Sequence, residues 1–221
     1  MRLELPVIRV QVQLDHMKPG LPPRRRYEPG ILRQVASLRL TPDGAVGLDA
    51  DGTERIDVHN VKHSHTRNSK GRNGISIMTT GDYAALRAVY GPHITDGIAG
   101  ESLLLDYAEG LARRAMPDEL TIAENRVIHS DLNRVIHGDT DSATHSPGKT
   151  GRAELVLTGV HVAKPCVEFT RFCLRRADFD VDDAIRQGLA NLDNGARGYK
   201  MSAATCAVIR PGDIVVFELP D

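Results

Sequence analysis

A cysteine preceded by a lysine and a proline, Lys164-Pro165-Cys166, is the point of the sequence best suited to chemistry. A thiolate is a nucleophile and a soft metal ligand, and a nearby lysine favours the thiolate form. The alternating, β-branched run from Ala153 to Val162 predicts a strand that delivers Cys166 to its end, where the proline stiffens the backbone. The sequence therefore predicts a reactive cysteine, with a buried structural cysteine as the alternative.

A polar, basic segment contains the densest group of anion donors. The stretch from Val58 to Asn73 has almost no apolar residues, so it is expected to be an exposed loop. The candidate ligand-binding residues in it are His63, His65, Arg67, Arg72 and Asn73. Because arginine forks match phosphate oxygens, a phosphate-recognising loop is the preferred interpretation. A merely solvated loop and a metal site at the two neighbouring histidines are the alternatives.

Two glycines frame a small apolar pair at Gly97-Ile98-Ala99-Gly100. This pattern predicts a tight turn at which another group approaches the backbone. Glu101 follows the turn and precedes a predicted strand from Ser102 to Leu105. The basic, proline-rich segment from Met17 to Arg26 is expected to be a solvated loop, with phosphate binding by its arginines as the alternative.

The elements that position these residues are mostly short strands. Alternation predicts strands at Ile8 to Leu14, Val35 to Leu40 and Ala45 to Leu48, and helical spacing predicts helices at Tyr83 to Tyr90 and Asp180 to Leu192. Because strands dominate and neither a dinucleotide-binding glycine motif nor a P-loop occurs, the expected fold is mainly β with a few helices. A closed or nearly closed β-barrel satisfies this pattern best.

The segment from Asn125 to Asp131 is nearly repeated eight residues later, from Asn133 to Asp139. A polar stretch with few apolar residues follows it, so residues 125–151 are expected to form a loop insertion. The two histidines and two aspartates of the repeat suggest either a metal cluster or a duplicated turn element.

The composition excludes several classes of protein. With 28 basic and 29 acidic residues the net charge is −1, so no global field would hold nucleic acid or an anionic membrane. No apolar run is long enough for a secretory signal or a membrane span, so a cytoplasmic location is expected. Three cysteines argue against a disulfide framework, and Cys173 and Cys206 are expected to be core residues.

Four short motifs in this order resemble the MOSC domain, which lies at the C-terminus of molybdenum-cofactor sulfurases. They are Gly97-Ile98-Ala99-Gly100-Glu101-Ser102-Leu103, Val162-Ala163-Lys164-Pro165-Cys166, Gly195-Ala196-Arg197-Gly198-Tyr199 and Ile209-Arg210-Pro211-Gly212-Asp213. The resemblance is clearest from about residue 37 to 217 and indicates a stand-alone, single-domain member over residues 1–221. It implies a mixed-strand β-barrel with a cavity that bears Cys166.

The resemblance also implies a function. MOSC domains bind a molybdenum-pterin cofactor through its phosphate, or handle sulfur, and some relatives are reductases. Here Cys166 would be a molybdenum ligand or a persulfide carrier, and Lys164 stands where the family usually has arginine. Glu101 and Arg197 would join the basic loop in binding the cofactor or a similar phosphate-bearing ligand. A molybdenum-dependent reductase or a sulfurtransferase would need a small-molecule substrate and a separate electron- or sulfur-donor protein.

Two other functions remain open for the same cavity. The first is a cofactor-independent tailoring enzyme for a small carboxylate or phosphate, with Glu101 or His161 as acid or base. The second is a ligand-binding barrel without catalysis, since a fold by itself does not imply a function. In both cases no cofactor would be needed.

Overall fold

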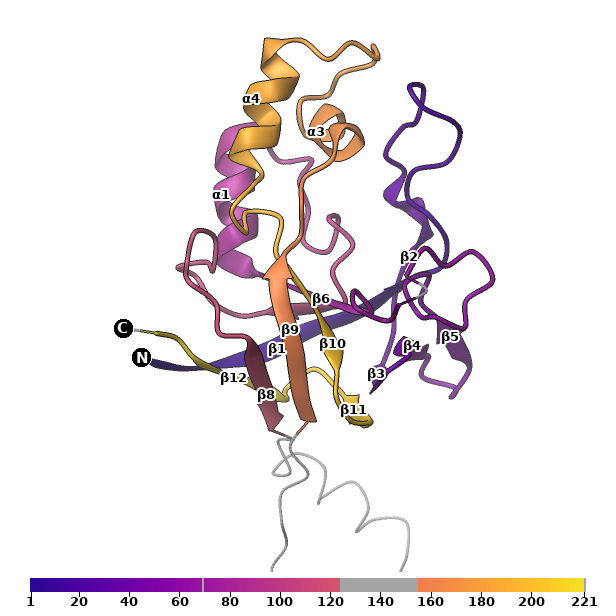
Figure 1. The fold of residues 1–221 in the computed structure, drawn as a ribbon, viewed down its shortest axis with the longest axis vertical. Helices are drawn as coiled ribbons and strands as arrows, with labels where there is room; N and C mark the ends of the chain where they lie inside the picture. Colours follow the sequence, from indigo (N-terminus) through magenta and orange to yellow (C-terminus); the bar gives the residue numbers. More distant parts are fainter. Residues whose placement is uncertain (69, 124–154, 221) are drawn as a thin grey trace, which may run out of the picture.

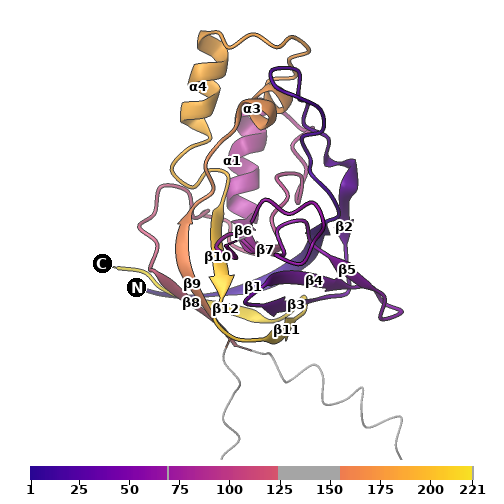
Figure 2. The ribbon, with the colours of Figure 1, turned by 45° about the vertical axis from the view of Figure 1, so that its right-hand side comes forward.

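A sheet that closes on itself forms the centre of the computed structural model, which describes residues 1–68, 70–123 and 155–220 (Figures 1 and 2). Its strands are β1 (Arg2–Gln13), β6 (Ile75–Thr79), β7 (Leu103–Leu105), β8 (Glu119–Ala123), β9 (Leu155–Val162), β10 (Tyr199–Ala203) and β12 (Ile214–Glu218). Their order is β12-β8-β9-β10-β6-β7-β1, and β1 pairs with β12 to close the barrel. The pair β6–β7 is parallel and the others are antiparallel. The prediction of a mixed, closed β-barrel is confirmed.

A smaller sheet lies beside the barrel, in the order β11-β3-β4-β5. Its strands are β3 (Ser37–Thr41), β4 (Gly44–Leu48), β5 (Glu54–Ile56) and β11 (Ala207–Ile209). The strands predicted at Val35 to Leu40 and Ala45 to Leu48 are present as the hairpin of β3 and β4, and Gly44 at its turn has a φ of 119°. A 3-10 turn, η1 (Pro29–Ile31), leads into β2 (Leu32–Gln34), which pairs with the end of β1.

The described helices, α1 (Thr80–Tyr90), α3 (Val167–Cys173) and α4 (Asp183–Asn191), gather on one side of the barrel, at the top of Figure 1. Both predicted helices are therefore present. Thr79 caps α1 by accepting a hydrogen bond from the Asp82 backbone amide, and Asp182 caps α4 in the same way. None of the helices in the described ranges is long and apolar enough to cross a membrane.

Side chains that alternate along the strands fill the barrel. The interior includes Val7, Val10, Ile75, Ile77, Leu103, Leu105, Leu120, Leu157, Tyr199, Met201, Val215 and Phe217. A second apolar cluster, with Tyr27, Met78, Tyr83, Leu86, Phe169 and Cys173, joins α1 and α3 to the outside of the barrel. Burial of each large apolar side chain contributes about 1.5–3 kcal/mol to folding. The strand residues between the inward ones are thus free to build a site on the outer face.

The region around Cys166 differs from the sequence-based expectation. The predicted strand is present as β9, but Cys166 lies four residues beyond its end and immediately precedes α3. Phe169 to Cys173 belong to this helix and do not continue the strand. The physical reason is local, because Pro165 has no amide for a strand ladder and the Cys166 carbonyl accepts from both the amide and the hydroxyl of Thr170. The near repeat and the insertion at 125–151 lie outside the described residues.

A glycine just before β10 provides the first test of the fold. Gly198 has a φ of 84°, and a Cβ there would meet the carbonyl oxygen of Ile77. Gly52 has a φ of 83° but nothing within 4 Å of its added Cβ. We expect Gly198→Ala to lower the free energy of unfolding by about 3 kcal/mol and Gly52→Ala by about 1 kcal/mol, because only the first adds a collision to the backbone strain. Urea denaturation measures both, and equal losses would contradict this account.

Candidate functional site

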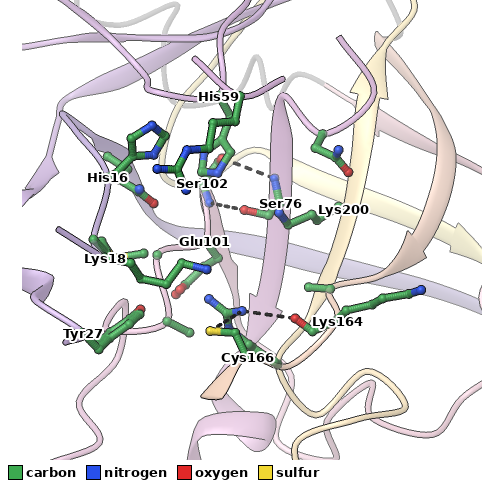
Figure 3. A pocket seen from close by; sticks show the side chains of 18 residues that line it. His16, Lys18, Tyr27, His59, Ser76, Glu101, Ser102, Lys164, Cys166 and Lys200 are labelled. Carbon is green, nitrogen blue, oxygen red and sulfur yellow. Dashed lines mark hydrogen bonds between the residues drawn. The ribbon is translucent and has the colours of Figure 1, made fainter. Parts of the chain in front are cut away.

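A cavity of about 210 Å³ opens on the outer face of β6 and β10 (Figure 3). Ser76 and Lys200 lie directly opposite each other in the β6–β10 pair, and their strand neighbours point into the barrel core. Because side chains alternate along a strand, these two side chains face outward. The lining residues are Gln13, His16, Met17, Lys18, Tyr27, His59, Arg67, Asn73, Ser76, Ala99, Gly100, Glu101, Ser102, Ala163, Lys164, Cys166, Arg197 and Lys200.

The cation that contacts the Cys166 thiol is Arg197, not Lys164. Arg197 Nη1 lies 3.8 Å from Cys166 Sγ and donates a hydrogen bond of 3.2 Å to the Lys164 carbonyl. The Arg197 guanidinium also stacks on the Phe169 ring, 4.9 Å from its centroid. The Lys164 side chain is exposed and points away from the sulfur (Figure 3). The expectation that Lys164 supplies the charge at the thiol is therefore wrong, because its exposed side chain points away from the sulfur, whereas the Arg197 side chain reaches it.

Two sequence motifs meet at this thiol through their backbones. Arg197 lies between Gly195 and Gly198, whose φ angles are 85° and 84°. The Gly198 carbonyl accepts a hydrogen bond of 3.0 Å from the Ala163 amide. The left-handed glycines turn the chain so that the arginine side chain reaches the cysteine motif, and the backbone bond holds the two segments together.

Glu101 lines the cavity with a buried carboxyl group, one oxygen of which has no hydrogen-bond partner among the described residues. Its side chain is 3% exposed, Oε2 accepts a hydrogen bond of 2.7 Å from the Tyr83 hydroxyl, and Oε1 has no hydrogen-bond partner in the described part of the chain. Burial raises the pKa of Glu101 to about 7, although the Tyr83 bond lowers it in part. The turn before it is as predicted, since the Met17 side chain packs on Gly100 and Gln11 donates to the Gly97 carbonyl. Glu101 is therefore able to exchange a proton near neutral pH.

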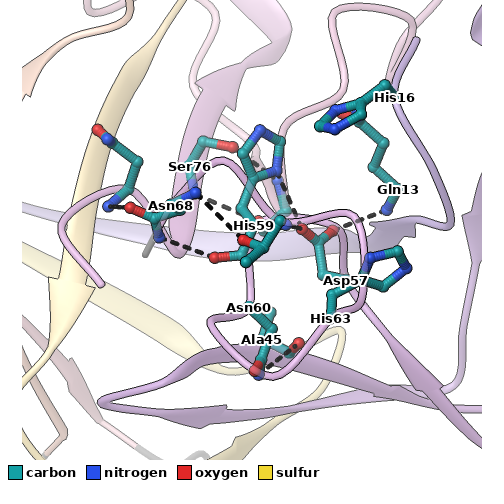
Figure 4. A network of polar contacts seen from close by, with 12 residues as sticks. Gln13, His16, Ala45, Asp57, His59, Asn60, His63, Asn68 and Ser76 are labelled. Atoms are coloured by element: carbon teal, nitrogen blue, oxygen red, sulfur yellow. Dashed lines mark hydrogen bonds and ion pairs between the residues drawn. The ribbon is translucent and has the colours of Figure 1, made fainter. Parts of the chain in front are cut away.

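A carboxylate holds His59, which also lines the cavity (Figure 4). Asp57 is 3% exposed and accepts from the Gln13 amide at 2.7 Å and the His59 amide at 2.8 Å. His59 Nδ1 lies 3.0 Å from the same carboxylate. Because a carboxylate only accepts, Nδ1 donates in this contact, and in the neutral ring Nε2 is then an acceptor. The network fixes the position of His59.

Positive charge dominates the described residues that line the cavity. The cations are Lys18, Arg67, Lys164, Arg197 and Lys200, and the carboxyl group is that of Glu101. Burial, together with Arg197 and Lys18, lowers the pKa of Lys200 to about 8. An anion in this cavity would meet several cations and would itself stabilise the charged form of Lys200.

The structure brings most of the sequence-predicted site residues to this cavity. Those that line it are Lys164, Cys166, Arg67, Asn73, Glu101 and Arg197. His63 instead contacts the Leu14 carbonyl at 3.2 Å, and His65 contacts Asp15 at 3.2 Å. Arg72 is exposed and lies outside the lining. His63 and His65 lie away from the cavity because their part of the loop folds back onto the residues that follow β1.

Several lining residues were missed from the sequence. They are His16, Lys18, Tyr27, His59, Ser76 and Lys200. The alternation around Tyr199 and Met201 was a usable signal for Lys200, because it assigns Lys200 to the face opposite the core. Lys18 and Tyr27 belong to an irregular segment, so no periodicity could place them.

The other two cysteines differ from each other. Cys173 is buried as predicted, and burial raises the pKa of its thiol to about 12. Cys206 is exposed, so its prediction as a core residue is wrong. Across the described ranges no three histidine, cysteine or carboxylate side chains form a metal-binding group.

Comparisons with known proteins establish the class of fold. No family model matches the sequence, and no curated protein matches it. The structure is a closed, mixed β-barrel with a few helices, as the resemblance to MOSC domains implied. It is similar to the crystal structure of APC1665, the YUAD protein from Bacillus subtilis, with a TM-score of 0.54, 11% sequence identity, and coverage of 100% of this chain and 99% of that chain. A crystal structure of a hypothetical protein matches with a TM-score of 0.51, 12% identity, and coverage of 98% and 69%.

The contact between Arg197 and Cys166 predicts which cation controls the thiol. We expect Arg197→Gln to slow alkylation of Cys166 by iodoacetamide on the order of fivefold at pH 7, because a cation within 4 Å stabilises the thiolate. Lys164→Gln should have a smaller effect. Mass spectrometry of the alkylated peptides gives the rate at each cysteine, and the exposed Cys206 in the same sample is the internal control. A larger effect of Lys164→Gln would reverse the assignment.

The buried carboxyl of Glu101 predicts a pH dependence of stability. Between its ordinary pKa of 4.5 and about 7, the folded protein holds a proton that the unfolded chain has lost, so Glu101 makes stability fall as pH rises through this window. We expect Glu101→Gln to gain on the order of 3 kcal/mol relative to the wild type between pH 4.5 and pH 8. Urea unfolding at both pH values measures the difference. Glu218→Gln, which removes an exposed carboxyl, is the control, and an equal shift there would contradict the prediction.

Proposed function

We propose that the cavity is that of a MOSC-type protein, which binds a phosphate-bearing anionic ligand and performs chemistry at the Cys166 thiolate. The observation that carries this proposal is the contact of Cys166 Sγ with Arg197 at 3.8 Å in a cavity that five cations line. A thiolate beside an arginine is reactive, and clustered cations recognise phosphate. The resemblance of the cysteine and arginine motifs to MOSC domains supports the same function.

The residues present fit a molybdenum-pterin ligand in donor chemistry. Arg67, Lys18 and Lys200 would hold the phosphate, and Cys166 offers the soft sulfur ligand that molybdenum accepts. The volume of about 210 Å³ is below the roughly 300–1,000 Å³ of typical small-molecule sites, so a pterin would extend beyond the cavity. When bound, molybdenum would supply two-electron redox chemistry at the thiolate.

The residues of the chain have separate tasks in this proposal. Arg197 places a positive charge 3.8 Å from Cys166 Sγ, and its stacking on Phe169 limits its movement. Glu101 gives or takes a proton near neutral pH, because its pKa is raised to about 7. His59, held by Asp57, presents Nε2 as an acceptor for a substrate proton or an ordered water.

Sulfur transfer is the other reaction of the same thiolate. The Cys166 thiolate attacks the outer sulfur of a persulfide donor, the sulfur–sulfur bond of the donor breaks, and the donor leaves as a thiolate. Cys166 then carries the persulfide, and no external oxidant is needed. A separate sulfur-donor protein, or an electron donor in the case of a reductase, is the partner that this function requires.

A cofactor-independent enzyme is a second candidate, which the free Oε1 of Glu101 and the Asp57-held His59 favour. Both groups line the cavity and suit acid–base catalysis on a small anion. His161, the alternative acid or base, is exposed and bonds to Asn73 at 2.8 Å, and it lies outside the cavity lining. Turnover by metal-stripped, pterin-free protein would support this candidate over the first.

Metal and sulfur analysis tests the proposal directly. The wild type, Cys166→Ala and Cys206→Ser are purified from a host that makes the molybdenum cofactor, and molybdenum, pterin and cyanide-labile sulfur are measured per chain. We expect the wild type and Cys206→Ser to carry molybdenum or labile sulfur and Cys166→Ala to lose it, because the ligand or carrier atom is gone. Arg67→Gln with Lys200→Gln should lose the pterin but keep the fold.

The same measurements define the contrary outcome. If the wild type contains neither molybdenum nor pterin and forms no persulfide at Cys166 after incubation with polysulfide, the thiolate proposal fails. Labile sulfur that disappears in Cys206→Ser and persists in Cys166→Ala would contradict it as well, since Cys206 is exposed and does not line the Cys166 cavity.

A further inference from the structure

A second cavity of about 240 Å³ lies beside α3 and takes no part in the function proposed above. Its lining residues are Arg25, Arg26, Tyr27, His93, Glu168, Arg171, Phe172, Arg175, Arg176, Asp178 and Phe179. They come from the proline-rich segment after β1, from the segment after α1, and from α3 with the loop that follows it. Arginine and aromatic side chains thus converge from three separate segments.

The lining has an excess of positive charge. Five arginines face two carboxylates, Glu168 and Asp178. Asp178 is already held by Arg176 at 2.7 Å, which also bonds to Asp182 at 2.9 Å. The other four arginines form no ion pair with a carboxylate in the described part of the chain, so their field is not cancelled.

Arg171 places one of these charges in the protein interior. The residue is 6% exposed, and its guanidinium donates to the carbonyl oxygens of Pro23, Phe179 and Asp180, while Nε has no partner in the described ranges. Carbonyl dipoles satisfy hydrogen bonds but leave the net charge in place. A buried cation without a counter-charge is destabilising, and an anion bound next to it would supply that charge.

Aromatic rings form the apolar part of the cavity. Two guanidiniums lie over the Phe179 ring, whose centroid is 4.9 Å from Arg26 Cζ and 5.5 Å from Arg171 Cζ. Tyr27 and Phe172 contact each other with centroids 5.3 Å apart. These rings hold the arginines in place and offer faces on which a planar group can stack.

Arg175 is held at the rim by a neutral histidine. Arg175 Nε donates to His93 Nδ1 at 3.2 Å, so Nδ1 is an acceptor and the ring proton lies on Nε2. Nε2 then donates to the carbonyls of Phe172 and Cys173 at 3.3 and 3.1 Å. Arg175 also has a φ of 54°, a conformation that glycine adopts without strain. An exposed arginine is therefore fixed where the helix end would favour glycine.

We propose that this cavity is a second ligand site, which binds a small aromatic phosphate monoester. Arg25, Arg26 and Arg175 would hold the phosphate, and the ring would stack against the wall of Tyr27 and Phe172. The volume of about 240 Å³ suits a single ring with its phosphate. Tyr27 lines both cavities, so the ligand would contact one wall of the Cys166 cavity from behind.

Phenyl phosphate is the probe that tests this site, by isothermal titration calorimetry at low ionic strength. The titrations use Lys18→Gln/Arg67→Gln/Lys200→Gln protein, because these changes remove the three cations assigned to the phosphate in the first cavity. We expect saturable binding of one phenyl phosphate, and binding at least about tenfold weaker for inorganic phosphate and for phenol, since each supplies half of the contacts.

Two further variants in this background locate the ligand. Adding Arg26→Gln and Arg175→Gln should weaken phenyl phosphate binding at least about tenfold, whereas adding Arg186→Gln, which removes an exposed arginine of α4, should leave it unchanged. Absence of saturable binding, or equal affinity in both sets of variants, would overturn the proposal. The result does not depend on molybdenum or the thiol, so failure here is distinct from failure of the function proposed for Cys166.

Discussion

Closure of the barrel by β1 is the constraint on which the rest of the structure depends. This strand of 12 residues pairs in succession with β12, β7 and β2, so one continuous segment links the last strand, the centre of the chain and the loops around the cavity. Its final amide, that of Gln13, donates to Asp57 and so ties the His59 segment to the barrel. The cavity is assembled only when this long-range pairing is complete, because its lining residues are far apart in sequence.

The cavity is lined by charged side chains, unlike the apolar interior of the barrel on which it lies. The interior of the barrel is apolar and closed, whereas the outward residues of β6 and β10 meet cations from four other segments. The low pKa of Lys200 and the raised pKa of Glu101 have the same main cause, which is burial that disfavours a charge. Since both shifts bring a proton equilibrium close to neutral pH, the cavity combines a thiol, a proton donor and a set of anion-binding cations.

The aromatic cluster of Tyr27, Phe169 and Phe172 connects the two cavities physically. Arg197, which contacts the thiol, stacks on Phe169, and Phe169 packs on Tyr27 with centroids 4.8 Å apart. Tyr27 and Phe172 in turn form a wall of the arginine-lined cavity. The α3 segment therefore serves both cavities, since Cys166 immediately precedes the helix and the helix supplies Glu168, Arg171 and Phe172.

The sequence by itself determined the strand-rich barrel class and the helices α1 and α4, and it indicated Cys166 and Arg197 as candidate site residues. The fold features follow from periodicity and from glycine and proline positions, which act over a few residues, whereas Arg197 became a candidate only through the resemblance of its motif to MOSC domains. Only the tertiary structure decided that Arg197, and not Lys164, faces the thiol. It also decided which cations line the cavity, since Lys18 and Lys200 do and His63, His65 and Arg72 do not. The second, arginine-lined cavity likewise exists only in the folded chain. Side-chain directions in irregular segments depend on long-range contacts such as barrel closure, and no local pattern encodes those contacts.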